Sequence, residues 1–117
     1  MKEAKKERGG RVNRINSLIN QIVASEFIRS SDPILNELTI TYVDTSIDMK
    51  KTTVYISSLN NKSKVINHSL MKNRSKVQKK IAEELMMKYT PKLIFEIDPF
   101  SIQADKINEL LNNISDE

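Results

Sequence analysis

The apolar residues of this sequence change their spacing along the chain, from a helical period to a strand period and back again. From Val12 to Phe27 they recur three or four residues apart, which is the spacing of one face of an α-helix. This pattern predicts an amphipathic helix over about residues 11–29. Asp32-Pro33 is expected to stop it, because proline disfavours a helical conformation at the residue before it.

Two β-strands are predicted after this helix. Residues 38–43 are rich in β-branched side chains and alternate with a period of two. The alternation is expected to place three apolar side chains on one face of the first strand: Leu38, Ile40 and Tyr42. A turn at residues 44–48 leads to a second strand over about residues 52–59. Because this connection is short, the two strands are predicted to form an antiparallel hairpin.

A second long helix is predicted over about residues 62–87. Its apolar residues keep to one face, but Asn73-Arg74-Ser75 interrupts the middle. Asn and Ser side chains compete for backbone hydrogen bonds and favour turns and helix N-caps over helix interiors. We therefore expect a kink or break there, which would place a new helix N-terminus at this point. A third strand is predicted over residues 93–97, and Asp98-Pro99 is expected to begin a final amphipathic helix.

The predicted order of elements is therefore α-β-β-α-β-α, with the second long helix kinked. A chain of 117 residues suits a single domain. We expect an α+β fold in which helices cover one face of a three-stranded sheet. Residues 1–10 are predicted to be a flexible basic arm, residues 11–114 the folded domain, and residues 115–117 an acidic tail.

Basic residues gather in two segments of the chain. The net charge is only +4, but residues 62–80 carry seven Lys or Arg side chains and no acid, and residues 1–14 carry six. Such a separation suits a protein that presents one face to phosphates. A lysine-rich composition could also simply solvate the surface, although it does not explain the separation from Asp and Glu. The candidate RNA-binding residues are Arg8, Arg11, Arg14, Lys62, Lys64, Lys72, Asn73, Arg74, Ser75, Lys76, Lys79 and Lys80.

The sequence offers little for catalysis. Cysteine is absent, and the single histidine, His68, stands without a neighbouring carboxylate and is expected to be a surface residue. The only glycines are Gly9 and Gly10, so no phosphate-binding glycine loop exists. No acidic cluster has the spacing of a metal site. We therefore expect a protein that is not an enzyme and holds no cofactor, and that stays in the cytoplasm without a membrane segment.

Several motifs in fixed order make the chain similar to the ribosome-binding factor A family. The family's Arg-Tyr-Thr-Pro-x-Leu-x-Phe-x-x-Asp segment is matched by Lys88–Asp98, and its Val-Tyr-Val-Ser strand by Val54–Ser57. Lys106–Leu111 resembles the family's basic-Ile-x-x-Leu-Leu ending. The resemblance runs from about Arg11 to Leu111. The chain departs from it at Asn73-Arg74-Ser75, where the family has Ala-x-Gly at the kink between two helices.

This resemblance implies a KH type II-like RNA-binding domain over residues 11–114. It also implies a monomeric factor that binds the small ribosomal subunit during assembly. Such factors assist maturation of the 5′ end of the small-subunit RNA and matter most in the cold. Glycine would allow RNA backbone to approach the kink closely, so its replacement puts that approach in doubt, and Arg74 is expected to compensate with a phosphate contact.

Two other functions stay open. One is a KH-like binder of free single-stranded RNA, which we consider weaker because the Tyr and Phe residues are scattered and mostly fit core positions. The other is a protein-interaction module that uses the acidic final helix.

Overall fold

The computed structural model describes residues 10–58 and 60–98 of the chain. The flexible arm, the final helix and the acidic tail, apart from Gly10, therefore lie outside the described residues and stay predictions. Gly10 itself was expected to belong to the arm, but it is the first residue of a helix.

The described elements follow the order helix, short helix, two strands, long helix and strand. Their bounds are α2 Gly10–Arg29, α3 Pro33–Asn36, β1 Thr39–Thr45, β2 Lys51–Ser57, α4 Ser63–Leu85 and β3 Lys92–Ile97. Their order agrees with the predicted one except for α3. This short helix is added because the Asp32 side chain caps it, accepting a hydrogen bond from the Ile34 N–H, and Pro33 is tolerated in the first turn.

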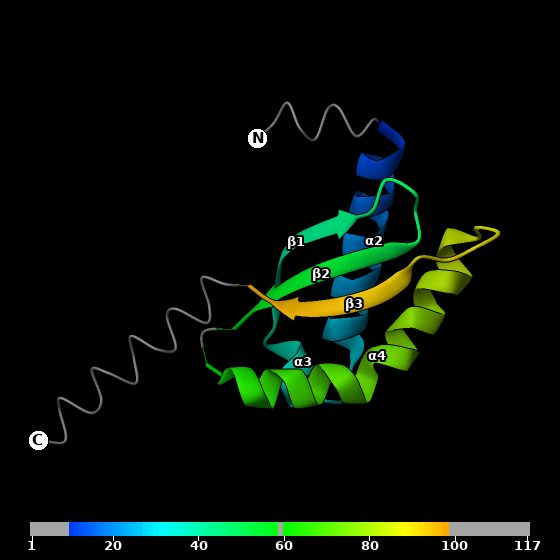
Figure 1. Cartoon of the computed structure of the whole chain (residues 1–117). Coiled ribbons are helices and arrows are strands. Elements are labelled where there is room, and N and C mark those ends of the chain that lie inside the picture. The colour runs from blue at the N-terminus through cyan, green and yellow to red at the C-terminus, as the bar shows by residue number, and fades with distance from the viewer. Residues whose placement is uncertain (1–9, 59, 99–117) are drawn as a thin grey trace, which may run out of the picture.

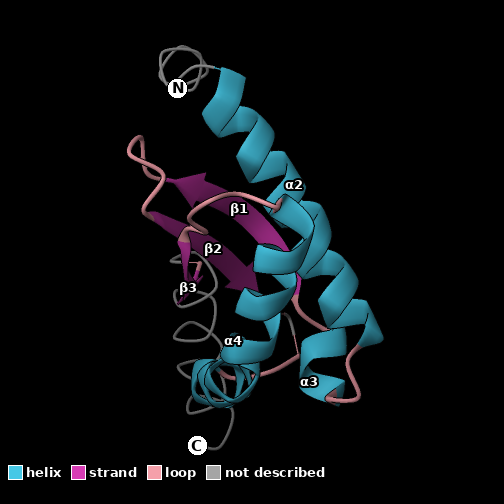
Figure 2. Ribbon diagram, turned by 90° about the vertical axis from the view of Figure 1, so that its right-hand side faces the viewer, coloured by secondary structure: helices cyan, strands magenta, loops and turns pink. Residues whose placement is uncertain are grey.

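The three strands form one mixed sheet in the order β1-β2-β3. β1 and β2 are antiparallel, which confirms the predicted hairpin, and β2 and β3 are parallel. A parallel pair needs a long crossover, and α4 provides it. In Figure 1 the sheet lies in front of α2, and Figure 2 shows α2 on one side of the strands with no described helix on the opposite side. The α+β prediction, with helices on one face, is confirmed.

The core lies between the sheet and the helices. Its most deeply buried side chains come from every layer and include Ile19, Val23, Leu35, Val54, Ile56, Ile66, Leu70, Ile81 and Leu93. Complete burial of an aliphatic side chain of this size contributes about 1.5–3 kcal/mol. The periodic stripes of α2 and α4 therefore explain why both helices pack on the sheet.

The predicted facing of β1 was wrong for Tyr42. The pairing with β2 shifts by one residue between Ile40 and Tyr42, so Thr41 is an extra residue, as in a β-bulge. The shift turns Tyr42 to the outer face, where its ring lies 6.0 Å from the ring of Tyr55. Val43 takes the inward position and is buried.

The tyrosines were expected mostly to fit core positions, and this prediction was wrong for the three of them. Tyr42 and Tyr55 are half-buried on the outer face of the sheet, and Tyr89 is 77% exposed. Phe27 is buried and pairs with the half-buried Phe95 at 5.9 Å between ring centroids. The phenylalanines of the described chain are therefore core residues, whereas the tyrosines are available at the surface.

α4 bends sharply near its middle but is not broken (Figure 1). The predicted kink is present, whereas the predicted new helix N-terminus is not, since helix runs without interruption from Ser63 to Leu85. The Asn73 side chain donates a hydrogen bond to the Ser69 carbonyl, which is the acceptor one helical turn earlier. A side chain that enters the backbone hydrogen-bond ladder in this way bends a helix. Asn73 thus bends α4 instead of ending it.

Candidate nucleic-acid interface

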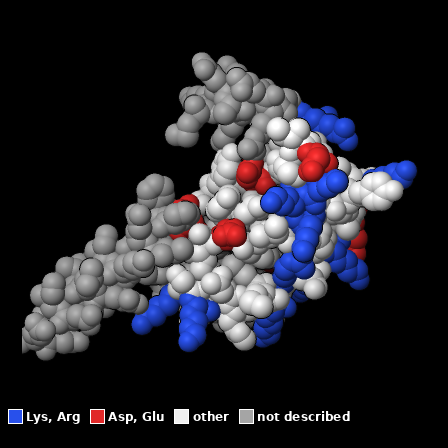
Figure 3. Space-filling model, in the orientation of Figure 1, with Lys and Arg blue, Asp and Glu red and all other residues white. Residues whose placement is uncertain are grey.

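α4 presents a row of lysines on the side that faces away from the core. Lys64, Lys72, Lys76 and Lys79 are exposed, and so is Lys62, the residue that precedes the helix. Figure 3 shows Lys and Arg atoms along the lower edge of the molecule, where Figure 1 places the first half of α4. We call Lys72, Lys76 and Lys79 the lysine face. It offers three exposed positive charges to RNA phosphates.

Lys80 differs from the other lysines. Its side chain is 33% exposed, and its Nζ lies 3.5 Å from the carboxylate of Glu84, one turn further along α4. This pair is of the ordinary surface kind and neutralises the Lys80 charge locally. Lys80 is therefore a weaker candidate for phosphate binding than the lysine face.

A groove of about 200 Å³ lies between the first half of α4 and β3. Leu70, Met71 and Arg74 line it from the helix, and Lys92 and Ile94 from the strand. Met71 is 79% exposed, so the groove combines apolar walls with cations at its border. Surfaces that bind single-stranded nucleic acid combine these two features, because the bases make apolar contacts and the phosphates require positive charge.

Arg74 has a structural partner in addition to its predicted RNA-binding role. Its side chain is half-buried, and Nε donates a 2.9 Å hydrogen bond to the Leu93 carbonyl. This contact ties the bend of α4 to β3. The guanidinium has four further N–H donors, so binding of a phosphate stays a prediction for this residue.

Asn73 is held by Asp32, a residue that the sequence did not suggest as part of the site. The Asp32 carboxylate accepts hydrogen bonds from the Ser69 hydroxyl at 2.6 Å and from the Asn73 amide at 3.1 Å. Asp32 precedes α3, so the network fixes the bend of α4 against that helix. Asn73 therefore contributes to the site by positioning it. Ser75, in contrast, is exposed and free to face a ligand.

The hydrogen bond from Ser69 is the main cause that lowers the pKa of Asp32 below its ordinary value of 3.8, and the Ile34 N–H, Asn73 and Lys72 act in the same direction. A lowered pKa means that the folded state favours the ionised carboxyl more than the unfolded chain does. The resulting stability is present above pH 3.8 and is lost as the pH falls through the folded-state value.

We expect Asp32→Asn to lose less of its unfolding free energy than the unmodified chain when the pH is lowered from about 5 to about 2. Urea denaturation followed by circular dichroism measures this difference. Asn caps a helix about as well as Asp, so the helix cap itself is preserved. Parallel pH profiles for the two chains would contradict the assigned role of Asp32.

Gln78 clamps the start of β3 onto α4. Its amide donates to the Pro91 carbonyl at 3.0 Å and accepts from the Leu93 N–H at 2.7 Å. The Gln78 amide thus makes the two hydrogen bonds that the backbone of a neighbouring strand would otherwise make with these groups. Nothing in the sequence distinguished Gln78, since glutamine is common on helix surfaces.

Gln78→Met should lower the unfolding free energy by roughly 2 kcal/mol, because it keeps the side-chain volume but leaves two backbone groups without partners. Chemical denaturation measures this change. A matched control is Lys79→Met, one residue further along, which changes an exposed side chain and is expected to shift stability by about 0.5 kcal/mol or less. Equal effects of the two substitutions would argue against the clamp.

The remaining predicted residues do not join the lysine face. Arg11 and Arg14 are exposed on the first turns of α2, and Arg8 lies outside the described residues. Arg11 lines a hollow with Lys50 and Lys88. Lys51 of β2 pairs in register with Lys92 of β3, and the Lys92 N–H donates to the Lys50 carbonyl. The fold therefore brings together a second group of basic residues. This group was not predicted from the sequence, because its members come from separate segments of the chain.

Other classes of site find no support in the described part of the chain. His68 is exposed, as expected. Across residues 10–58 and 60–98, no group of three or more His, Asp or Glu side chains could hold a metal ion. None of the helices in these ranges has the length and apolar character that a bilayer crossing requires.

Comparison with known proteins supports the resemblance found in the sequence. The sequence profile of the family described as "Ribosome-binding factor A" matches residues 11–111. Ribosome-binding factor A of Finegoldia magna is 32% identical over 112 residues, which cover 92% of this chain and 93% of that protein. The protein of the same name from Ligilactobacillus salivarius is 32% identical over 108 residues, covering 89% and 91%.

Solved structures share the fold. The crystal structure of ribosome-binding factor A from Thermus thermophilus has a TM-score of 0.67 at 21% identity, covering 74% of this chain and 93% of that one. A Thermus thermophilus homology model fitted into the cryo-EM map of a 30S–RbfA complex has a TM-score of 0.59 at 22% identity, covering 69% and 88%. The α+β architecture is thus the one found in these structures.

Proposed function

The chain belongs to the ribosome-binding factor A family, and we propose that it binds the small ribosomal subunit and its RNA while that subunit is being assembled. The observation that carries the proposal is the lysine face, whose three side chains are exposed on α4. Arg74 and Lys92 add positive charge at the separate groove between α4 and β3. The related Thermus thermophilus protein fitted into the map of a 30S complex supports the same partner.

The physical role of such a factor is to select one arrangement of the RNA. A protein that binds one of several folds of an RNA shifts the population toward that fold without covalent chemistry. We propose that the selected arrangement allows maturation of the 5′ end of the small-subunit RNA. Because cold stabilises incorrect base pairs, the need for the factor should be greatest at low temperature.

Sedimentation of a cell lysate tests the partner. The protein should migrate with small subunits at low salt and return to the top of the gradient as salt rises, because phosphate contacts release counterions. If the protein stays at the top of the gradient even at low salt, the proposal is wrong. In cells that lack the chain, small-subunit RNA with extended 5′ ends should accumulate, and more of it should accumulate in the cold.

The same experiment separates the two other functions. A binder of free single-stranded RNA would bind oligonucleotides but would not migrate with subunits. A protein-interaction module would migrate with a partner even after nuclease treatment and would depend little on salt. The exposed Tyr89 favours the binder of single-stranded RNA over the protein-interaction module, because a base can stack on its ring.

A further inference from the structure

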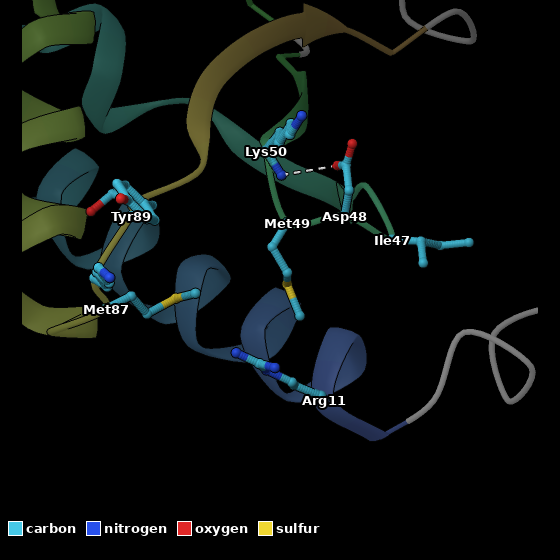
Figure 4. A pocket seen from close by; sticks show the side chains of 9 residues that line it. Arg11, Ile47, Asp48, Met49, Lys50, Met87 and Tyr89 are labelled. Atoms are coloured by element: carbon cyan, nitrogen blue, oxygen red, sulfur yellow. Dashed lines mark hydrogen bonds between the residues drawn. The ribbon is translucent and has the colours of Figure 1, made fainter.

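A hollow of about 700 Å³ lies where three distant parts of the chain meet, beyond the end of α4. The first turn of α2 contributes Arg11, the turn between β1 and β2 contributes Met49 and Lys50, and the segment after α4 contributes Met87, Lys88 and Tyr89. Figure 4 shows the side chains of Met49 and Met87 extending toward this space from two different segments. The volume is in the range of sites that hold a small molecule or one nucleotide.

The hollow has apolar surface and an exposed aromatic ring. Met49 and Met87 are half-buried and pack against the core, so they form a fixed apolar wall. Tyr89 is 77% exposed, and the Nζ of Lys88 lies 5.6 Å from the centre of its ring. One face of an exposed ring beside a cation is a platform on which a base can stack.

The charge of the hollow suits a nucleotide. Arg11, Lys50 and Lys88 line it, against one carboxylate, Asp48. Asp48 is already occupied within its own turn, since it accepts hydrogen bonds from the Ser46 hydroxyl at 2.6 Å and from the Lys50 N–H at 3.0 Å. The three cations therefore outnumber the single carboxylate, and their charge is available to an external anion. Lys51 and Lys92, at the first residues of β2 and β3, add two further positive charges nearby.

We propose that this hollow binds an unpaired nucleotide of the small-subunit RNA, with the base stacked on Tyr89 and the flanking phosphates on Arg11, Lys50 and Lys88. The inference rests on the proposed function for the identity of the RNA. It adds a second point of contact at the end of α4, and with it a preference for an RNA segment that carries an unpaired base there.

Binding of purified small subunits by three chains tests this site: the unmodified protein, Tyr89→Ala and Tyr89→Phe. Tyr89→Ala should weaken binding by about 5-fold or more, the loss expected for one stacked base. Tyr89→Phe keeps the ring and should bind within about 2-fold of the unmodified protein. Because Tyr89 is exposed, neither substitution is expected to disturb the core.

A second measurement uses a short single-stranded oligoadenylate and the amide NMR signals of Lys50, Lys88 and Tyr89. Addition of the oligonucleotide should shift these signals in the unmodified protein, and at the same concentration it should shift those of Lys50 and Lys88 clearly less in Tyr89→Ala. If the protein fails to bind subunits but these shifts occur, the proposed function fails and the nucleotide site stands.

Three outcomes would overturn the nucleotide site. One is that Tyr89→Ala binds subunits as well as the unmodified chain. Another is that Tyr89→Phe loses as much affinity as Tyr89→Ala. The third is that Tyr89→Ala weakens subunit binding while the oligonucleotide leaves the three signals unchanged, which would assign the hollow to a ribosomal protein instead.

Discussion

Replacement of Lys72, Lys76 and Lys79 together by alanine should weaken binding of small subunits roughly tenfold and flatten its dependence on salt. All three side chains are exposed on the outward side of α4, so each is free to neutralise a phosphate. Each phosphate contact contributes about 0.7 to 0.9 to the slope of log affinity against log salt concentration. The triple variant should therefore lose a slope of about 2 to 3.

The matched control replaces the same three lysines by arginine. It keeps the charge and the helix propensity, so its salt slope should equal that of the unmodified protein. Circular dichroism establishes that both variants are folded. A folded alanine variant with unchanged affinity and slope would show that the lysine face does not bind RNA.

The double substitution Asn73→Ala/Arg74→Ala should lower the unfolding free energy by about 2–4 kcal/mol. It removes the bond from Asn73 to Asp32, its bond to the Ser69 carbonyl, and the bond from Arg74 to the Leu93 carbonyl. These contacts hold the bend of α4 against α3 and β3. Chemical denaturation at neutral pH measures the loss.

The double variant should also bind subunits more weakly than Arg74→Ala alone, because the two halves of α4 would no longer hold Lys72 in a fixed position relative to Lys76 and Lys79. Ser75→Ala is the control in the same turn, since Ser75 is exposed, and it should change stability by about 0.5 kcal/mol or less. A double variant as stable as Ser75→Ala, or one that binds as well as Arg74→Ala, would refute the positioning role.

Most of the fold was predictable because it depends on periodic patterns. The apolar residues from Val12 to Phe27 fall on one face only if this segment is helical, and α2 ends at Arg29 as expected. The hairpin followed from alternation and a short connection. The facing of Tyr42 could not be predicted in this way, because the bulge at Thr41 inserts one residue and alternation alone does not reveal it.

The lysine face was predictable because its members lie close in sequence on one helix. The contacts that orient it were not, since they join distant residues. Asp32 meets Ser69 and Asn73 across 37 and 41 residues, and Gln78 reaches Leu93 across 15. We expected the Asn73 side chain to compete for backbone hydrogen bonds, and it does bind the Ser69 carbonyl. Because the Asp32 carboxylate is its other partner, Asn73 bends the helix without ending it.

Directed hydroxyl-radical cleavage tests most directly whether the bend of α4 faces the small-subunit RNA. The chain contains no cysteine, so Ser75→Cys carries a single attachment point for an iron chelate. The matched probe is Asn20→Cys, an exposed position on the side of α2 next to β1, the strand at the opposite edge of the sheet from β3. We expect the chelate at position 75 to cut the small-subunit RNA at discrete sites, and the one at position 20 to cut it weakly. Strong cleavage from position 20 with none from position 75 would contradict the proposed interface.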